Sequence, residues 1–300
     1  MDMPRPSRTL EELRREIDRI DDAIHDLIMR RADLISEIAL AKRGAGAAEG
    51  GYLRPGREAV VLRRLLARHH GLFPKPALVR LWREIISAPL ALQGAFSVAV
   101  FAPKEAPGYF DLARDHYGSF ASMSVHDTPG QVIRALGEGR AILGVLPAFT
   151  EEDRDPWWRH LARVGERVPS VIARLPVAPG GNARGDGLAA LVVGPDVAEA
   201  TGSDRSCVVF EVEGEPSRAR LGAELGKAGL TPRFLQSWSE GEGGRRLILV
   251  ELDGFLEKDD PRLASFAGAG GGDIRRFFRI GGYALPFEAK ELAAPKAKSA

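Results

Sequence analysis

The first hydrophobic pattern of the chain runs from Thr9 to Arg43 and is typical of an amphipathic helix. Apolar residues recur in steps of three and four, the spacing of a helix that packs on other helices. We call these residues the seam; they are Leu10, Leu13, Ile17, Ile20, Ile24, Leu27, Leu34, Ile38 and Ala41. Thr9 and Glu12 form a capping box ahead of them. Where the pattern calls for Leu or Ile at position 31, the sequence has arginine, so the helix carries a guanidinium on its packing face.

Two further helices follow before residue 97. The segment "RPGREAVVLRRLLARHHG" predicts a helix opened by Pro55 and closed by Gly71. A third helix runs from Pro76 towards Phe96, with a bend near Pro89. The apolar residues that it is expected to turn inwards are Leu78, Leu81, Trp82, Ile85 and Ile86. A first helix of about 50 Å is hard to bury within one chain. We therefore predict an intertwined helical dimer.

The pattern changes at residue 97, where short runs typical of buried strands begin. "SVAVFAP" and "AILGVLPAF" indicate strands with two helices between them, and the alternation continues through "VIARLPVAP" to "LAALVVG". This is the pattern of an α/β region. A third region has the βαββαβ order of a ferredoxin-like domain. Its predicted elements are 206–212, 217–229, 233–239, 245–252, 261–267 and 274–283.

The predicted fold is therefore multidomain. We expect an all-α three-helix domain over 1–95, a small α/β lobe over 96–203, a ferredoxin-like domain over 204–287 and a disordered tail over 288–300. A length of 300 residues is enough for two or three domains.

Charge and cysteine content exclude several classes of protein. The 42 Lys and Arg residues against 41 Asp and Glu leave a net charge of +1, which argues against nucleic-acid binding through bulk charge. Cys207 is the single cysteine, so there is no disulfide framework and no Cys-based metal site. The opening "MDMPRPSR" lacks the apolar core of a signal peptide, and no run is long enough to cross a bilayer. We expect a cytoplasmic protein that contacts no membrane.

Arg31 is one of several polar residues on apolar helix faces. Lys42 lies about 20° from Arg31 around the same helix and about 16 Å along it, so the two side chains share a face. On the second helix Glu58 is aligned with an apolar stripe, and Arg57 lies beside it. On the third helix Gln93 is aligned with apolar residues in the same way. Buried charge without a partner is costly, so these positions need an explanation.

Two interpretations are open. The residues could form a structural Arg–Glu network, with Arg31 extending out of the seam. Because the cations outnumber the carboxylate, they could instead line a pocket for a small dianion. No Ser/His/Asp set or metal-ligand cluster accompanies them in the sequence. A reaction at this pocket would rest on positioning and electrostatics, with no cofactor.

The first region resembles a known enzyme family. The segments "LRREIDRIDDAIHDLIMRRADLISEIALAKR", "RPGREAVVLRRL" and "LWREIISAPLALQ" are similar, in order and spacing, to the all-helical class of chorismate mutases. The resemblance covers residues 9–95. It implies an intertwined homodimer in which each active site takes one arginine from the partner chain. It also implies the rearrangement of chorismate to prephenate in phenylalanine and tyrosine biosynthesis, without a cofactor.

The resemblance also implies which residues bind the substrate's carboxylates. Arg14 would be the arginine supplied by the partner, and Arg31 would bind a carboxylate from within the chain. Arg57 would support a carboxylate.

Three further residues are implied at the substrate's oxygen atoms. Lys42 and Gln93 would donate hydrogen bonds to the ether oxygen that breaks away, and Glu58 would hold the ring hydroxyl. Gripping both carboxylates selects the reactive conformer, and a cation at the ether oxygen stabilises the charge that grows there. A neutral glutamine at position 93 predicts that the rate does not fall between about pH 6 and about pH 8.5. Arg54 and Pro89 depart from the family, some of whose members carry Asp and Ser at these positions.

In some proteins this mutase is followed by prephenate dehydratase and an ACT regulatory domain, and residues 97–200 and 204–286 resemble that order. The dehydratase's Thr-Arg-Phe triplet is here Leu188, Ala189 and Ala190, and the glycine-rich turn is "APKEAP". The stretch before that triplet is also too short for a complete second lobe. We therefore expect no dehydratase activity.

The ACT effector motifs are also changed. They read Ser217-Arg218-Ala219 and, at 236–239, "QSWS". An amino-acid effector at this domain and a purely stabilising role are both open.

Three hypotheses result from the sequence. The leading one is a chorismate mutase with a degenerate dehydratase-like lobe and an ACT-like domain. The second is a bifunctional mutase and dehydratase. The third is a non-catalytic regulatory protein that binds an aromatic metabolite or another pathway enzyme.

Overall fold

The computed structural model describes most of the chain. The described residues are 8–44, 53–92, 96–165, 168–179, 187–197, 199–214, 217–241, 243–268 and 274–293. Contacts divide the chain into two compact units, Met1–Glu49 and Gly50–Ala300. The first unit contains one helix, and the second contains all the other elements.

The helix of the first unit, α1, spans Leu10–Gly44. Its N-terminus carries the predicted capping box, because Oγ1 of Thr9 accepts from the Glu12 amide at 3.2 Å and the Thr9 amide donates to Oε2 of Glu12 at 2.8 Å. The seam runs along α1 as predicted. Its Leu and Ile side chains are 42–66% exposed, so a long apolar stripe lies on the surface of this chain.

The second unit is built on strands and helices that alternate along the chain. In order, its helices and strands are α2 (Pro55–Arg68), α3 (Lys75–Leu92), β1 (Ser97–Phe101), α4 (Gly108–Tyr117), β2 (Ser122–His126), α5 (Pro129–Gly137), β3 (Leu143–Pro147), η1 (Trp157–Leu161), β4 (Ser170–Leu175), β5 (Ala190–Gly194), β6 (Asp204–Val212), α6 (Arg218–Lys227), β7 (Pro232–Ser239), β8 (Arg246–Asp253), α7 (Pro261–Gly268), β9 (Ile274–Ala284) and α8 (Ala289–Leu292).

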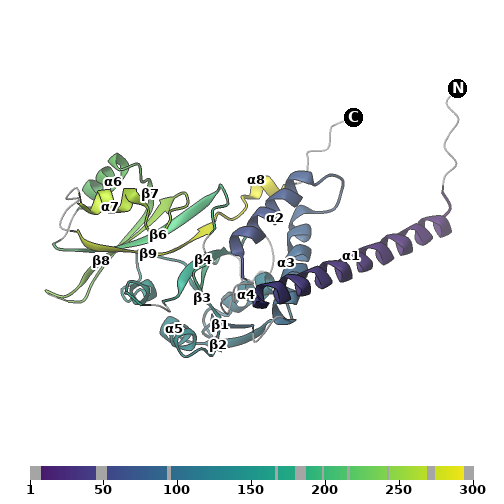
Figure 1. The fold of residues 1–300 in the computed structure, drawn as a ribbon, viewed down its shortest axis with the longest axis horizontal. Helices are drawn as coiled ribbons and strands as arrows, with labels where there is room; N and C mark the ends of the chain where they lie inside the picture. The colour runs from purple at the N-terminus through teal and green to yellow at the C-terminus, as the bar shows by residue number, and fades with distance from the viewer. Residues whose placement is uncertain are drawn as a thin grey trace, which may run out of the picture. The chain divides into compact units, whose positions relative to one another are not determined.

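The strands form one nine-stranded sheet in the order β2-β1-β3-β5-β4-β9-β6-β8-β7 (Figure 1). The strands β2, β1 and β3 are parallel, whereas β5 is antiparallel to both β3 and β4. In β1, Val98 and Val100 face the side covered by α4, and Ala99 faces the side covered by α5. The strand β2 was not predicted, because its exposed edge position leaves little apolar alternation in "SMSVH".

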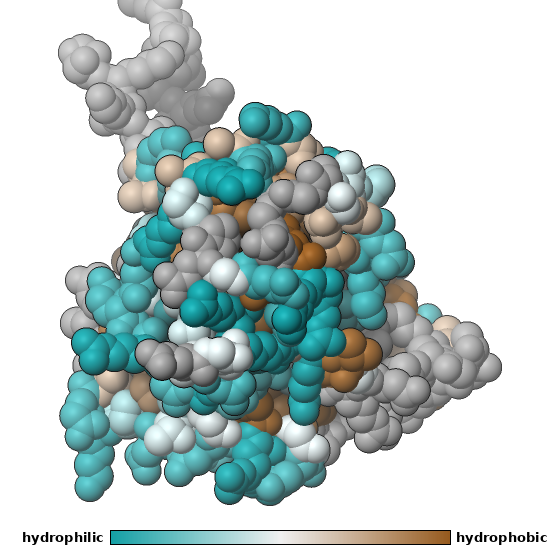
Figure 2. Space-filling view, turned by 90° about the vertical axis from the view of Figure 1, so that its left-hand side faces the viewer, coloured by the Kyte–Doolittle hydropathy of each residue, from teal (hydrophilic) through white to brown (hydrophobic). Residues whose placement is uncertain are grey.

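The last four strands and α6 and α7 follow the predicted β-α-β-β-α-β order, with the antiparallel strand order β9-β6-β8-β7. Seen from the side of the molecule that Figure 2 presents, the surface is largely hydrophilic, with scattered apolar areas. Among the described residues, no helix is both long and apolar enough to cross a bilayer.

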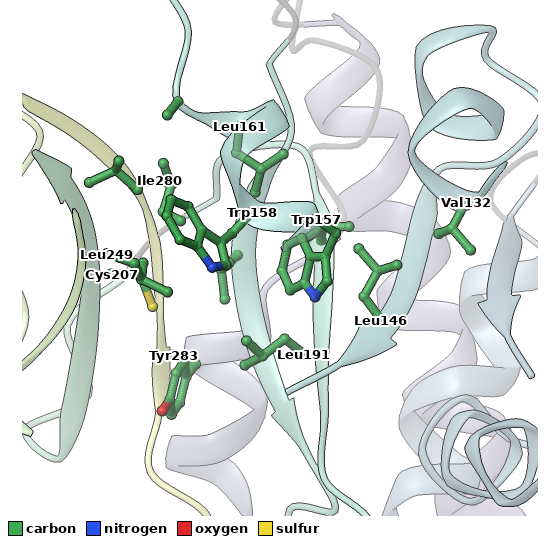
Figure 3. Packing of buried hydrophobic residues seen from close by; sticks show 14 of the residues in the cluster. Val132, Leu146, Trp157, Trp158, Leu161, Leu191, Cys207, Leu249, Ile280 and Tyr283 are labelled. Carbon is green, nitrogen blue, oxygen red and sulfur yellow. The ribbon is translucent and has the colours of Figure 1, made fainter. Parts of the chain in front are cut away.

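The α/β lobe and the ferredoxin-like region share their sheet and their core. The strands β4 and β9 join the two regions through a parallel pairing of Val171 with Gly281. Gly281 has φ of 127°, and a side chain there would overlap the backbone of Val171. Trp157 and Trp158 pack between strands of both regions (Figure 3). The α/β lobe and the ferredoxin-like region are therefore parts of one packed body.

The helices α2 and α3 pack on this body. Leu62 of α2 and Val79 of α3 form a buried cluster with Phe287 and Leu292 from the end of the chain. The predicted boundary at residue 95 thus differs from the division into compact units, which falls between Glu49 and Gly50. Hydrophobic contacts that are distant in sequence hold α2 and α3 against the sheet.

The end of the chain corrects one prediction. The predicted tail over 288–300 begins with the ordered helix α8, where Glu288 and Glu291 form a capping box. Leu292 of this helix is buried, and the carbonyl of Glu291 accepts from Lys75 Nζ at 2.7 Å. Burial of Leu292 against α2 and α3 orders the segment up to Ala293. The rest of the predicted tail lies outside the described residues.

The inward face of α3 also differs from the prediction. Of the five residues expected to face inwards, Ile86 is buried, whereas Leu81 is 46% exposed. The face of α3 that is buried in the second unit consists of Val79, Arg83, Ile86, Ser87 and Leu90. The helix continues through Pro89 to Leu92.

Candidate functional site

The two candidate site arginines of α1 lie too far apart to bind one small molecule from a single chain. Arg14 and Arg31 are separated by about 25 Å along the helix axis and by about 100° around it. Arg14 is exposed, and Arg31 occupies the seam and is half-buried. A site that uses both residues therefore needs two copies of α1.

Two of the predicted site residues cannot be placed. The side chain of Lys42, on α1, and Gln93, after the end of α3, lie outside the described residues. Arg57 and Glu58 lie in the first turns of α2, within the second unit. The Arg57 side chain is exposed, whereas Glu58 is largely covered.

Glu58 is bound to an arginine, Arg83, that was not among the predicted site residues. Nη1 of Arg83, on α3, donates to Oε2 of Glu58 at 2.5 Å. The Arg83 side chain is 3% exposed and that of Glu58 is 15% exposed. The structural Arg–Glu interpretation thus holds for the Glu58 carboxylate within this chain, although with Arg83 as the partner.

Arg83 is itself anchored on the lobe. Its Nε donates to the carbonyl oxygen of His116, at the end of α4, at 2.8 Å. Ser87 Oγ donates to the same carbonyl at 3.2 Å, and Arg80 forms an ion pair with Asp115. The last carbonyls of a helix carry partial negative charge and lack intrahelical partners, so they favour cationic donors.

These contacts come from one polar face of α3. Arg80, Arg83 and Ser87 are spaced three and four residues apart, so they lie in one row along the helix. Glu84, in the same row, lies directly against Gly118, whose φ is 78°. We call Arg80, Arg83, Glu84 and Ser87 the docking face.

The N-terminus of α2 is held by Glu199. The Arg57 amide donates to Oε2 of Glu199 at 3.2 Å, and Nε of Arg54 donates to Oε1 of Glu199 at 2.7 Å. A carboxylate at a helix N-terminus is favoured by the helix dipole. Position 54, where some chorismate mutases carry Asp, is thus used here for a structural contact. Its arginine binds α2 to the segment before β6.

A small cavity borders the Glu58–Arg83 pair. It lies between α2 and the strands β4 and β9, and its polar lining includes Glu58, Arg63, Arg83, His116 and Arg174. Its volume of about 30 Å³ suits one or two water molecules. Nη2 of Arg83 and Nδ1 of His116 are buried without a partner among the described residues.

His116 is neutral near pH 7. Burial, and then the Arg83 guanidinium, lowers the pKa of His116 well below its ordinary value. A neutral ring avoids like-charge repulsion with Arg83. The backbone carbonyl of His116 accepts the hydrogen bonds of the docking face. Its neutral side chain packs edge-on against Tyr117.

Two of the three apolar side chains at the positions of the dehydratase triplet belong to a hydrophobic cluster or pack against it. Ala190 is fully buried in β5, and Leu188 packs against the same cluster. Among the described residues, no group of three or more His, Cys, Asp or Glu side chains could hold a metal ion.

Residues at the positions of both ACT effector motifs make hydrogen bonds within the chain. Ser217 caps α6 by accepting from the Arg220 amide at 3.2 Å. Gln236 is 2% exposed. Its Oε1 accepts from Trp158 Nε1 at 2.8 Å, and its Nε2 donates to the Asp153 carbonyl at 3.0 Å.

The docking face was not predicted from the sequence. Its signal there is the three- and four-residue spacing of polar residues on α3. Charged residues at this spacing are usual on exposed helices, and the acceptor, a backbone carbonyl, leaves no mark in the sequence.

Residues 13–94 match the family described as chorismate mutase type II, which confirms the resemblance of the N-terminal region. The bifunctional chorismate mutase/prephenate dehydratase of Aquifex aeolicus (strain VF5) is 37% identical over 146 residues. The protein of the same name from Stutzerimonas stutzeri is 34% identical over 142 residues. Each match covers 46% of this chain and 38% of the relative, so the chain spans about two fifths of the length of these relatives.

Solved structures give only a distant likeness. The prephenate dehydratase from Streptococcus mutans aligns with 64% of this chain and 98% of its own, at 12% identity and a TM-score of 0.46. A likeness at this level does not bear on the function.

Proposed function

We propose that this chain is a chorismate mutase that converts chorismate to prephenate as a homodimer. The match of residues 13–94 to the chorismate mutase type II family is the observation that carries the proposal. The proposed site residues are Arg14, Arg31, Lys42, Arg57, Glu58 and Gln93. Arg14 comes from the partner chain, and the other five come from one chain.

The chemistry suits a site made of cations and one carboxylate. The rearrangement is unimolecular, so the protein needs to select the reactive conformer and to stabilise charge that appears in the transition state. Arg14, Arg31 and Arg57 hold the two carboxylates. Lys42 and Gln93 donate to the ether oxygen while its bond to carbon lengthens and negative charge grows on it. Glu58 accepts from the ring hydroxyl.

The homodimer is supported by the exposed seam and by the spacing of Arg14 and Arg31. An apolar stripe of this length on a free surface favours association with another helix. A second copy of α1 would cover the seam and bring the partner's Arg14 towards Arg31. The dimer thus accounts for both the exposed apolar residues and the polar residue among them.

We propose that the second unit has no prephenate dehydratase activity, and that its later part is an ACT-like domain with a stabilising role. The apolar residues at the triplet and the internal contacts of Gln236 support this. Under this proposal the chain is not a bifunctional mutase and dehydratase, because the positions of the dehydratase triplet carry no polar side chains.

A product assay tests the proposal. The purified chain is incubated with chorismate, and the products are separated and identified, with Lys42→Ala beside it and Lys104→Ala as a control on a lysine outside the site. We expect prephenate from the wild type and the control, at least about 100-fold less from Lys42→Ala, and no phenylpyruvate. Absence of turnover by a folded, dimeric wild type would overturn the mutase and favour a non-catalytic binding protein. Phenylpyruvate would restore the bifunctional alternative.

A further inference from the structure

The α3 residue Arg83 binds the one carboxylate of the proposed site and, with the same guanidinium, the body of the second unit. Nη1 contacts Glu58 and Nε contacts the His116 carbonyl. A guanidinium is planar and rigid, so two of its donors that are engaged on different partners fix the relative position of those partners. The place of the Glu58 carboxylate is therefore set by α4, a helix outside the region that matches the mutase family.

The anchor of Arg83 is firm. The helix α4 packs Leu112, Ala113 and Tyr117 into the buried cluster on its side of the sheet. Arg80 forms an ion pair with Asp115 at the same end of α4. The His116 carbonyl is thus held by the packing of α4, and Arg83, at 2% exposure, has little freedom to move away from it.

Glu58 remains able to act on a ligand while it is bound to Arg83. The contact uses Oε2, and no further partner of the Glu58 carboxylate occurs within the described part of the chain. Oε1 therefore keeps its lone pairs for another donor, such as a hydroxyl. A carboxylate with one oxygen fixed has fewer side-chain rotamers to lose when the other oxygen binds a substrate.

We infer that Arg83 is a positioning residue for Glu58 and that the α/β lobe, through the end of α4, is part of the support of the mutase site. This inference rests on the proposed function. It gives the degenerate lobe a role in catalysis that needs no dehydratase chemistry, because the lobe supplies a backbone carbonyl and a rigid core.

A double-mutant cycle on the full chain tests the inference. Chorismate turnover is measured for wild type, Arg83→Gln, Glu58→Gln and the double variant. If Arg83 acts through Glu58, Arg83→Gln lowers kcat/KM by about tenfold or more in the wild-type background and by less than about twofold in the Glu58→Gln background. If Arg83 had only a structural role, Arg83→Gln would lower kcat/KM by the same factor in both backgrounds.

Ser87→Ala is the matched control. It removes a hydrogen bond to the same carbonyl, from the same face of α3, and leaves Glu58 untouched. We expect a lower Tm with kcat and KM within about twofold of wild type. A loss of kcat/KM in Ser87→Ala as large as that in Arg83→Gln would overturn the inference, because general loosening of α3 would then account for both.

Arg83→Lys provides the result if Arg83→Gln does not fold. Lysine keeps the charge but lacks the rigid fork, so it cannot fix the two acceptors as arginine does. We expect a reduced kcat/KM that again disappears in the Glu58→Gln background. Equal kcat/KM in wild type and Arg83→Lys, or an equal loss in both backgrounds, would overturn the inference alone. Absence of turnover by the wild type would overturn the proposed function and the inference together.

Discussion

Arg83 Nη1 lies 2.5 Å from Oε2 of Glu58, although the two residues belong to different helices and only Glu58 stands out in the sequence as a polar residue on an apolar stripe. The ion pair is nearly enclosed, with side chains 3% and 15% exposed. Removing one member of such a pair leaves an uncompensated buried charge. The position of the Glu58 carboxylate in this chain therefore depends on α3 and on the α4 carbonyl that binds Arg83.

The distance between Arg14 and Arg31 predicts complementation between inactive variants. Arg14→Ala and Arg31→Ala homodimers should each lack activity, because every site loses one arginine. A mixed dimer of the two contains one intact site, since Arg31 of one chain meets Arg14 of the other. Random exchange makes half of the dimers mixed, so about a quarter of wild-type activity should return.

The measurement is the rate of prephenate formation after the two variants are mixed under conditions that allow chains to exchange. Each variant treated alone serves as the control. A mass-tagged chain shows whether exchange has occurred. If it has, and the rate of prephenate formation stays at that of the separate variants, the sites are not shared between chains.

The exposed seam predicts a charge-sensitive dimer. Ile24 is 50% exposed in this chain and would be buried by a second α1, so Ile24→Asp should dissociate the dimer, because an unpaired buried carboxylate is costly. Ser36→Asp introduces the same charge on α1 at an exposed position away from the seam and should remain dimeric. Molar mass by light scattering distinguishes them. If Ile24→Asp keeps the wild-type mass, the seam is not the interface.

The lowered pKa of His116 predicts acid sensitivity of the fold. The unfolded chain binds a proton at a pKa of about 6.5, whereas the folded chain resists protonation at this buried ring. The free energy of unfolding should therefore be unaffected by this group above about pH 6.5 and should fall as the pH drops from there towards the folded pKa.

Thermal melts across this pH range test the assignment to His116. His116→Gln should show a smaller loss of Tm with acid than wild type, because the neutral amide does not titrate. His70→Gln, at an exposed position, should follow the wild-type curve. Parallel curves for wild type and His116→Gln would assign the acid sensitivity to another group.

The contacts of Gln236 predict that phenylalanine has no effect. Both ends of this buried amide are engaged, by Trp158 and by the Asp153 carbonyl, so Gln236 is not available to bind an amino acid. Millimolar phenylalanine should leave the rate of prephenate formation and the Tm unchanged. A Tm that rises with phenylalanine concentration would demonstrate binding and would contradict this prediction.

Local features of the fold could be predicted from the sequence. The capping box at Thr9 and the seam of α1 follow from spacings of three and four residues, and the β-α-β-β-α-β order of the last region follows from changes of period. Such patterns depend on neighbours within a few residues. The strand β2 was missed because an exposed edge strand has a weak apolar alternation.

Part of the candidate site could also be predicted. Arg31 and Glu58 stand out because a charged residue interrupts an apolar face. Arg83 does not stand out, because the prediction for α3 took a different face as buried. The partner of Arg83 on the lobe is the carbonyl of His116, and any residue type at position 116 would supply that carbonyl.

By itself, the sequence determined the helices and strands, the apolar seam with its arginine and the likeness of its first region to the chorismate mutases. These depend on the order of residue types along short segments. Only the tertiary structure decided that α2 and α3 belong to the same unit as the sheet, that β4 and β9 join two predicted domains into one, and that Arg83 holds Glu58. These contacts join residues far apart in the chain, and several of them use backbone atoms that all residues share.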